Sequence, residues 1–170
     1  MAGLKDLYAA NFNSPKQVVV AGSAAALVEA ETRFAEARRP ANVLILKVAG
    51  PFHSPLVAEA AADFAPILEA TSFADPQTPL FSNVSGSRVS SGAEAKNLAL
   101  RQITESVRWT TEQAALAALG PLAVLEVGPG KVLQGLWKDS GSSIPAYGAG
   151  TLADLEASLA VLAQEQGVEQ

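Results

Sequence analysis

The sequence contains no cysteine and a single histidine, His53. Without cysteine, the chain cannot form disulfide bonds, thiolate metal sites or a cysteine nucleophile. One histidine is too few for most zinc sites, which draw on several His or Cys ligands. We therefore expect no metal site in this chain.

Basic residues are outnumbered, with 12 Lys and Arg against 17 Asp and Glu and a formal net charge of -5. Nucleic-acid binding needs a basic surface, so this balance argues against a nucleic-acid partner. The sequence also lacks the run of roughly 18 apolar residues that a membrane span requires. Residues 1–6 lack the basic and apolar regions of a signal peptide. We therefore expect a cytoplasmic protein without a membrane partner.

What the sequence does contain is apolar: 49% of its 170 residues are hydrophobic, and only 17% are charged. This composition can bury a core of one ordinary domain or of a piece of a larger one. Strand-like runs at residues 17–21, 43–48, 79–84, 123–127 and 144–147 alternate with helix-like segments at 23–37, 56–70, 94–103, 110–119, 131–138 and 152–162. Such alternation predicts an α/β fold with a mostly parallel sheet. The run at 43–48 is apolar almost throughout, so we expect it to be buried on both faces.

His53 follows this run, within the sequence GPFHSP at residues 50–55. Ligand sites of open α/β sheets lie at the carboxyl ends of strands, and histidine moves protons readily near neutral pH. A ring that only packs in the turn and a ring that acts as a general base both fit these facts. A base in acyl transfer needs a nucleophile, and the sequence has no G-x-S-x-G elbow to supply a serine.

Four segments resemble the malonyl-CoA:acyl-carrier-protein transacylases, in the order in which that family has them. They are NFNSP and QVVVAG within residues 11–22, GPFHSPL at 50–56, RQ with VRW within 101–109, and EVGPGKVL at 126–133. The resemblance extends from about residue 8 to residue 138, and more loosely to 155. It implies the C-terminal part of an acyltransferase fold, which is an α/β-hydrolase-like parallel sheet with helices, plus a remnant of a ferredoxin-like small subdomain.

The resemblance also implies a division of the chain. We expect the ferredoxin-like remnant at residues 1–48, the C-terminal part of the acyltransferase domain at 49–163 and a frayed tail at 164–170. A sheet without its other strands would expose unpaired edges, so we expect the isolated chain to be unstable or poorly soluble.

The activity implied by the resemblance is transfer of a malonyl group from malonyl-CoA to the pantetheine thiol of acyl carrier protein, through a serine ester, in fatty-acid biosynthesis. Malonyl-CoA and acyl carrier protein would be the partners, and no cofactor is needed beyond the carrier's own phosphopantetheine. Because the serine elbow is absent, the serine would have to come from residues outside this sequence. They could lie in a complementary N-terminal chain, or upstream in the same polypeptide if Met1 is an internal start. The isolated chain is expected to be inactive.

Four residues match functional positions of this family. His53 matches the catalytic histidine, and Gln102 matches the glutamine whose main-chain carbonyl orients that histidine, as an aspartate does in the serine-protease triad. Phe52 resembles a bulky residue that selects malonyl by narrowing the space beside the substrate's C2. Asn11 resembles an asparagine that lines the substrate cleft. Without the resemblance, Gln102 reads as an ordinary helix-end residue and Phe52 as a ring packed in the turn.

Residues 128–131, GPGK, follow one predicted strand and precede a predicted helix, as phosphate-binding loops do. They lack the complete phosphate-loop and dinucleotide patterns, so we predict a structural turn. Two other functions remain open at this point. One is an acyltransferase fragment of a polyketide-type system, and the other is a non-catalytic remnant that binds carrier protein.

Overall fold

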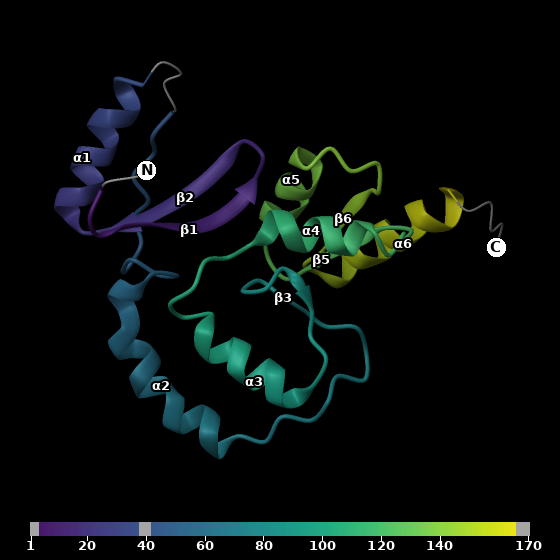
Figure 1. Ribbon diagram of the computed structural model, residues 1–170. Coiled ribbons are helices and arrows are strands. Elements are labelled where there is room, and N and C mark those ends of the chain that lie inside the picture. Colours follow the sequence, from purple (N-terminus) through teal and green to yellow (C-terminus); the bar gives the residue numbers. More distant parts are fainter. Residues whose placement is uncertain (1–3, 38–41, 166–170) are drawn as a thin grey trace. The chain divides into compact units, whose positions relative to one another are not determined.

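A computed structural model describes residues 4–37 and 42–165 (Figure 1). In chain order its elements are β1 (Leu7–Ser14), β2 (Gln17–Gly22), α1 (Ala24–Ala35), η1 (Pro55–Val57), α2 (Ala58–Ala70), β3 (Phe81–Ser82), β4 (Ser87–Arg88), α3 (Gly92–Arg101), α4 (Trp109–Ala117), β5 (Val124–Val127), α5 (Val132–Asp139), β6 (Ala146–Ala149) and α6 (Leu152–Glu165). None of the helices in this part of the chain has the length and apolar character needed to cross a membrane.

The described residues divide into two compact units. The first comprises the residues up to Asn13 and from Gln17 to Glu112, and the second comprises Ser14–Lys16 and the residues from Gln113 onward. The predicted division at residues 48 and 49 stays a prediction. Helix α6 reaches Glu165, and residues 166–170 of the predicted tail lie outside the described residues, as do 1–3 and 38–41 of the predicted remnant.

Strands β1 and β2 form a hairpin in the first unit (Figure 1). Strand β2 was expected, whereas β1 was not, because its sequence LYAANFNS contains two alanines, two asparagines and a serine and no β-branched residue. A further segment pairs with β1: the N–H of Val107 donates to Ala10 O over 2.8 Å, and the N–H of Phe12 donates to Val107 O over 2.8 Å. Hydrogen bonds to a residue far away in the sequence therefore stabilise a strand that the local sequence does not predict.

The prediction that residues 43–48 form a strand buried on both faces is wrong. This segment has no regular secondary structure, and Leu44 and Ile45 are 81% and 60% exposed. A strand depends on hydrogen bonds to a neighbouring strand and on burial of its side chains. No described strand pairs with residues 43–48, so an apolar sequence with high strand propensity remains unpaired.

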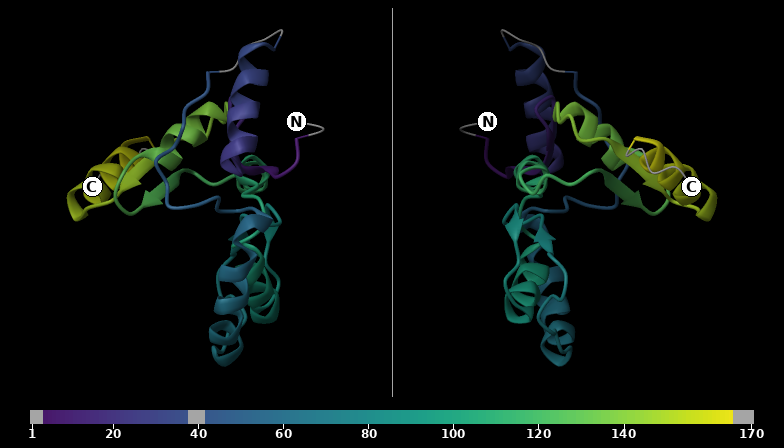
Figure 2. Two further views of the ribbon diagram at one scale, coloured as in Figure 1. Left: turned by 90° about the vertical axis from the view of Figure 1, so that its left-hand side faces the viewer. Right: turned by 90° about the vertical axis from the view of Figure 1, so that its right-hand side faces the viewer.

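Helices α2 and α3 run side by side in the first unit, as the two views of Figure 2 show. The segment between α2 and β3 is tied to the start of α3, because Asp75 Oδ1 accepts a hydrogen bond from the N–H of Gly92 over 2.8 Å. A Cβ atom at Gly92 would overlap the main-chain oxygens of Phe73 and Ala74. Only glycine allows α3 to begin this close to the preceding loop.

Strands β3 and β4 form a short antiparallel hairpin, with Phe81 opposite Arg88 and Ser82 opposite Ser87. Residues 85–92 are rich in serine and glycine, a composition typical of surface loops, but Val89 within them is only 4% exposed. It packs with Val84 and Leu98 in the core of this unit. The hairpin is therefore held to α3 by apolar contacts.

The second unit contains the parallel pair of strands that the sequence predicts at residues 123–127 and 144–147. Strand β5 pairs with β6, with Val124 opposite Ala146, and α5 and α6 pack against β6 (Figure 1). Trp137 of α5 is 2% exposed, and its indole N–H donates to Ile144 O over 2.8 Å. Helices and small sheets thus confirm the α/β class, although the described strands form three two-stranded sheets in place of one broad sheet.

Candidate active site

The turn at residues 50–55 is held closed by hydrogen bonds of its own. The N–H of Phe52 donates to Gly50 O over 3.0 Å, and the hydroxyl of Ser54 donates to Pro51 O over 2.6 Å. Ser54 is fully buried, and its Oγ also accepts from the N–H of Leu56 over 3.3 Å, at the start of η1. A serine followed by proline is a typical helix start, since proline lacks a backbone N–H and the first helical position does not need one. The sequence therefore builds a rigid turn around His53.

His53 lies at the centre of this turn in the left-handed region, with a φ of 58°. A non-glycine residue there costs about 1 kcal/mol, although histidine tolerates this region better than most residues. The conformation is stabilised from outside the turn, because the N–H of His53 donates to Ile103 O over 3.2 Å. A strained residue held by its surroundings is a common feature of functional sites.

The imidazole of His53 is held by the end of α3. Its Nδ1 lies 2.8 Å from the main-chain oxygen of Gln102, the residue that caps α3 at its C-terminus. A carbonyl at this end of a helix has no partner within the helix and is free to accept. With Nδ1–H donating to it, Nε2 keeps a lone pair and can act as a base. This is the contact that the resemblance implies, and the catalytic roles of His53 and Gln102 stay predictions.

Phe52 and Asn11 lie on different parts of the first unit. Phe52 is 52% exposed, so the ring beside His53 is not packed into the core. Asn11 lies on β1 opposite Val107. The chain from Gln102 to Val107 therefore contacts His53 at one end and β1 at the other, although no hydrogen bond joins Asn11 to His53 among the described residues. The substrate-binding roles of Phe52 and Asn11 also stay predictions.

The roles of two residues in this arrangement could not be predicted from the sequence. Ile103 contributes only a main-chain oxygen, so its side chain gives no signal. Ser54 did carry a signal, namely serine before proline at the start of a helix, but its link to the conformation of His53 appears only in three dimensions.

The GPGK segment is a turn in which Gly128 and Gly130 have positive φ, of 123° and 105°. The N-terminus of the helix that follows is already occupied by a carboxylate. Glu126 accepts from the N–H groups of Leu133 and Gln134, each over 3.0 Å. Burial alone would raise the pKa of Glu126, but these main-chain hydrogen bonds lower it below its usual range. Because an internal anion fills the place that a phosphate would take, the turn is not a phosphate loop.

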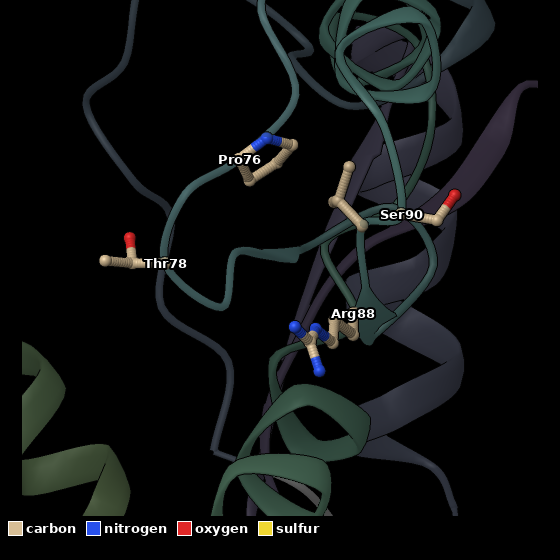
Figure 3. A pocket seen from close by; sticks show the side chains of 5 residues that line it. Pro76, Thr78, Arg88 and Ser90 are labelled. Atoms are coloured by element: carbon tan, nitrogen blue, oxygen red, sulfur yellow. The ribbon is translucent and has the colours of Figure 1, made fainter.

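An open hollow in the first unit is lined by Pro76, Thr78, Arg88, Val89 and Ser90 (Figure 3). In that view the hydroxyls of Thr78 and Ser90 lie on opposite sides and do not converge. Ser90 is already engaged, because its N–H and its hydroxyl both bind Glu94 Oε2. None of the predicted site residues lines this hollow, so it adds nothing to the candidate site.

Comparison with known proteins gives a consistent set of similar chains. The malonyl CoA-acyl carrier protein transacylase of Synechocystis sp. is 41% identical over 146 residues, which are 86% of this chain and 48% of the relative. The crystal structure of malonyl-CoA:acyl carrier protein transacylase from Xanthomonas oryzae superposes with a TM-score of 0.86 at 36% identity, covering 94% of this chain and 51% of that one. The partial α/β fold described above is therefore the fold of about half of such a protein.

A second similar structure is a complex of a type II polyketide acyl carrier protein with its malonyl-transacylase, with a TM-score of 0.84 and 34% identity, covering 94% of this chain and 52% of that one. A scan against models of protein families gives no match. The chain spans about half the length of the curated relatives it matches.

Proposed function

We propose that this chain is the histidine-bearing part of a malonyl-CoA:acyl carrier protein transacylase, acting in the cytoplasm in fatty-acid biosynthesis. The similarity to such enzymes over most of the chain supports the family, and the chain's half-length match agrees with a C-terminal part. The observation that carries the proposal is the ring of His53, held by the main-chain oxygen of Gln102 at 2.8 Å in a turn of left-handed backbone.

His53 would act as a general base in the first half of the reaction. Its Nε2 takes the proton from a serine hydroxyl as the serine oxygen attacks the thioester carbonyl of malonyl-CoA. The carbon–sulfur bond then breaks, and the coenzyme A thiolate leaves as thiol with the proton from the imidazolium. The second half runs the same steps in reverse with the carrier's pantetheine thiol, and the serine regains its proton. No resident cofactor is required.

The end of α3 would assist this proton transfer. The oxygen of Gln102 fixes the ring so that Nε2 faces away from the helix, and the partial negative charge at a helix C-terminus favours positive charge on the imidazole. Phe52, exposed beside His53, would limit the bulk at C2 of the acyl group. Asn11 would contact the substrate from β1.

A complementary part would supply the serine, because this sequence contains no G-x-S-x-G elbow. The exposed apolar side chains of Leu44, Ile45 and Leu46 support this idea. They form a segment with the composition of a buried strand, which a second polypeptide segment would pair with and cover.

The test is reconstitution. The chain is co-expressed with the half of the Synechocystis transacylase that carries the serine elbow, and malonyl transfer from malonyl-CoA to holo acyl carrier protein is measured. We expect transfer by the pair, none by either part alone, and a loss of at least about a hundredfold with His53→Ala. The variant Ser85→Ala, at an exposed loop position, serves as the control. Transfer by the chain alone, or transfer that survives His53→Ala, would contradict the proposal.

A polyketide-type system is the second candidate, and the likeness to the polyketide transacylase complex supports it. The reconstituted protein distinguishes the two through kcat/KM for a fatty-acid carrier and for a type II polyketide carrier. Faster transfer to the fatty-acid carrier is expected.

A further inference from the structure

Gln102 approaches the ring of His53 twice, and both contacts are made to the same atom. Its main-chain oxygen lies 2.8 Å from Nδ1, and its side-chain Nε2 lies 3.2 Å from Nδ1. The residue is partly buried and caps α3, which fixes its main chain. A main-chain group and a side-chain group of the same residue therefore both contact one ring nitrogen.

These two contacts place opposite demands on Nδ1. The carbonyl oxygen can only accept, so it requires a proton on Nδ1. An amide nitrogen can only donate, so it requires a lone pair there. In the neutral ring Nδ1 has one or the other, and the two contacts cannot both be hydrogen bonds with the nitrogen facing the ring. The other end of the amide, Oε1, is an acceptor and is compatible with the carbonyl.

The main-chain oxygen cannot change its chemistry, whereas the amide can turn by half a rotation about its last bond. We propose that the side-chain amide of Gln102 is a positioning group that selects the tautomer of His53: its oxygen faces Nδ1 and shares the Nδ1–H with the main-chain carbonyl. The contact at 3.2 Å is then a second acceptor for the same proton. The importance of this group for catalysis rests on the proposed function. The tautomer preference itself is a property of the ring and can be measured without it.

The opposite orientation of the amide defines an inactive arrangement. With its nitrogen donating to Nδ1, the ring proton moves to Nε2, where a base needs a lone pair. The carbonyl at 2.8 Å would then face a lone pair on Nδ1, which is unfavourable. The side chain of Gln102 would therefore raise the fraction of His53 that is ready to accept a proton.

The sequence allows a clean measurement, because His53 is its only histidine. The chain is labelled with ¹⁵N-histidine, purified with a tag that contains no histidine, and studied by NMR at a pH where the ring is neutral. The nitrogen shifts and their couplings to the ring protons give the ratio of the Nδ1–H to the Nε2–H form. The same spectra are recorded for the labelled chain bound to the unlabelled half with the serine elbow.

Two substitutions separate the side chain from the main-chain carbonyl, which both retain. Gln102→Met removes the amide and should lower the ratio of Nδ1–H to Nε2–H by about fivefold, the effect of one hydrogen bond of ordinary strength. Gln102→Glu offers only acceptors and should keep or raise this ratio. Gln77→Met, at an exposed position whose side chain binds Asp75 O, is the control. Circular dichroism checks that each variant keeps its helices, and Gln102→Leu replaces Gln102→Met if the latter unfolds.

An unchanged ratio in Gln102→Met would overturn the inference, and so would a ratio lowered in Gln102→Glu. The readout does not depend on malonyl transfer. If the reconstituted pair is inactive while the ratios change as expected, the proposed function fails and the role of Gln102 at the ring stands.

Discussion

The buried hydroxyl of Ser54 donates a hydrogen bond to the main-chain oxygen of Pro51 over 2.6 Å, and so closes the turn in which His53 takes a φ of 58°. The contact joins residues on either side of the histidine. It therefore helps to hold the backbone conformation from which the imidazole projects.

Replacing Ser54 with alanine should loosen this turn. The substitution removes the donor to Pro51 O and the acceptor for the N–H of Leu56, at a cost of about 1–3 kcal/mol. We expect faster hydrogen exchange of the amides of His53 and Leu56, measured by NMR, and slower transfer in the reconstituted enzyme with little change in KM. Ser85→Ala, on an exposed loop, should change neither. Exchange rates at wild-type values in Ser54→Ala would show that the prolines alone define the turn.

Two glycines should respond to alanine in opposite directions. Gly92→Ala places a Cβ against the main-chain oxygens of Phe73 and Ala74, so it should lower the free energy of unfolding by at least about 2 kcal/mol. Gly135 lies within α5 with open space around it, so Gly135→Ala should raise it by about 0.5–1 kcal/mol. Urea unfolding of the reconstituted protein measures both. A loss of stability at Gly135 would contradict the open surroundings described for it.

Glu126 should make the start of α5 sensitive to acid. Its pKa is lowered in the folded chain, so its stabilising effect is present above the unfolded value of about 4.3 and is lost as the pH falls through the lower folded value. Glu126→Gln should weaken the helix cap by about 0.5 kcal/mol at pH 7, and the difference from wild type should vanish at acid pH. Hydrogen exchange of the amides of Leu133 and Gln134 reports on the cap directly. Glu156→Gln, on the exposed face of α6, is the control and should leave the exchange of these two amides unchanged.

Glu112 should have the opposite effect on stability. It is 8% exposed, its Oε2 has no hydrogen-bond partner, and burial raises the pKa of its carboxyl. A raised folded pKa means that stability falls as the pH rises above about 4.3 and stays reduced at neutral pH. Glu112→Met should therefore raise the free energy of unfolding at pH 7 by about 1 kcal/mol, with a smaller gain at acid pH. Destabilisation at pH 7 would reveal a partner for this carboxylate.

The exposed segment 43–48 should govern assembly. Leu44→Lys replaces an apolar side chain that is 81% exposed with a charged one, so it should raise the soluble yield of the chain expressed alone. In the pair with the serine-bearing half, the same charge would be buried, and the affinity should fall by about tenfold or more. Val28→Lys, on the exposed side of α1, is the matched control. Equal affinity of Leu44→Lys and wild type would exclude this segment from the contact.

Local sequence sufficed for the elements whose stabilising contacts are close in the chain. Helix α1 lies within the helix-like segment predicted at 23–37, and the hydroxyl of Ser23 caps it by accepting from the N–H of Ala26 over 3.2 Å. Strand β5 was expected from its apolar run and pairs with β6, which follows α5 directly along the chain. In each case the stabilising contact is made by residues nearby in the sequence: three positions away for Ser23 and Ala26, and across a single intervening helix for β5 and β6.

Elements with distant or missing partners could not be predicted in this way. Strand β1 is completed by Val107, almost a hundred positions away in the sequence, and residues 43–48 have no described partner at all. At the candidate site, the residue types pointed to His53, but only the resemblance pointed to Gln102, since any residue can offer a main-chain oxygen. The side-chain contact of Gln102 and the hydrogen bond of Ser54 required the structure.

The exposed segment VLILKV at residues 43–48 also makes the rate of aggregation important for this molecule. Six residues with one charge and no proline or glycine are typical of sequences that stack into cross-β fibrils. Stacking between copies accelerates with concentration, whereas pairing with a strand of the same polypeptide does not. If this half is produced separately, fibril growth therefore competes with binding to the complementary half. The outcome would depend on the amounts of the two halves and on the order in which they are made.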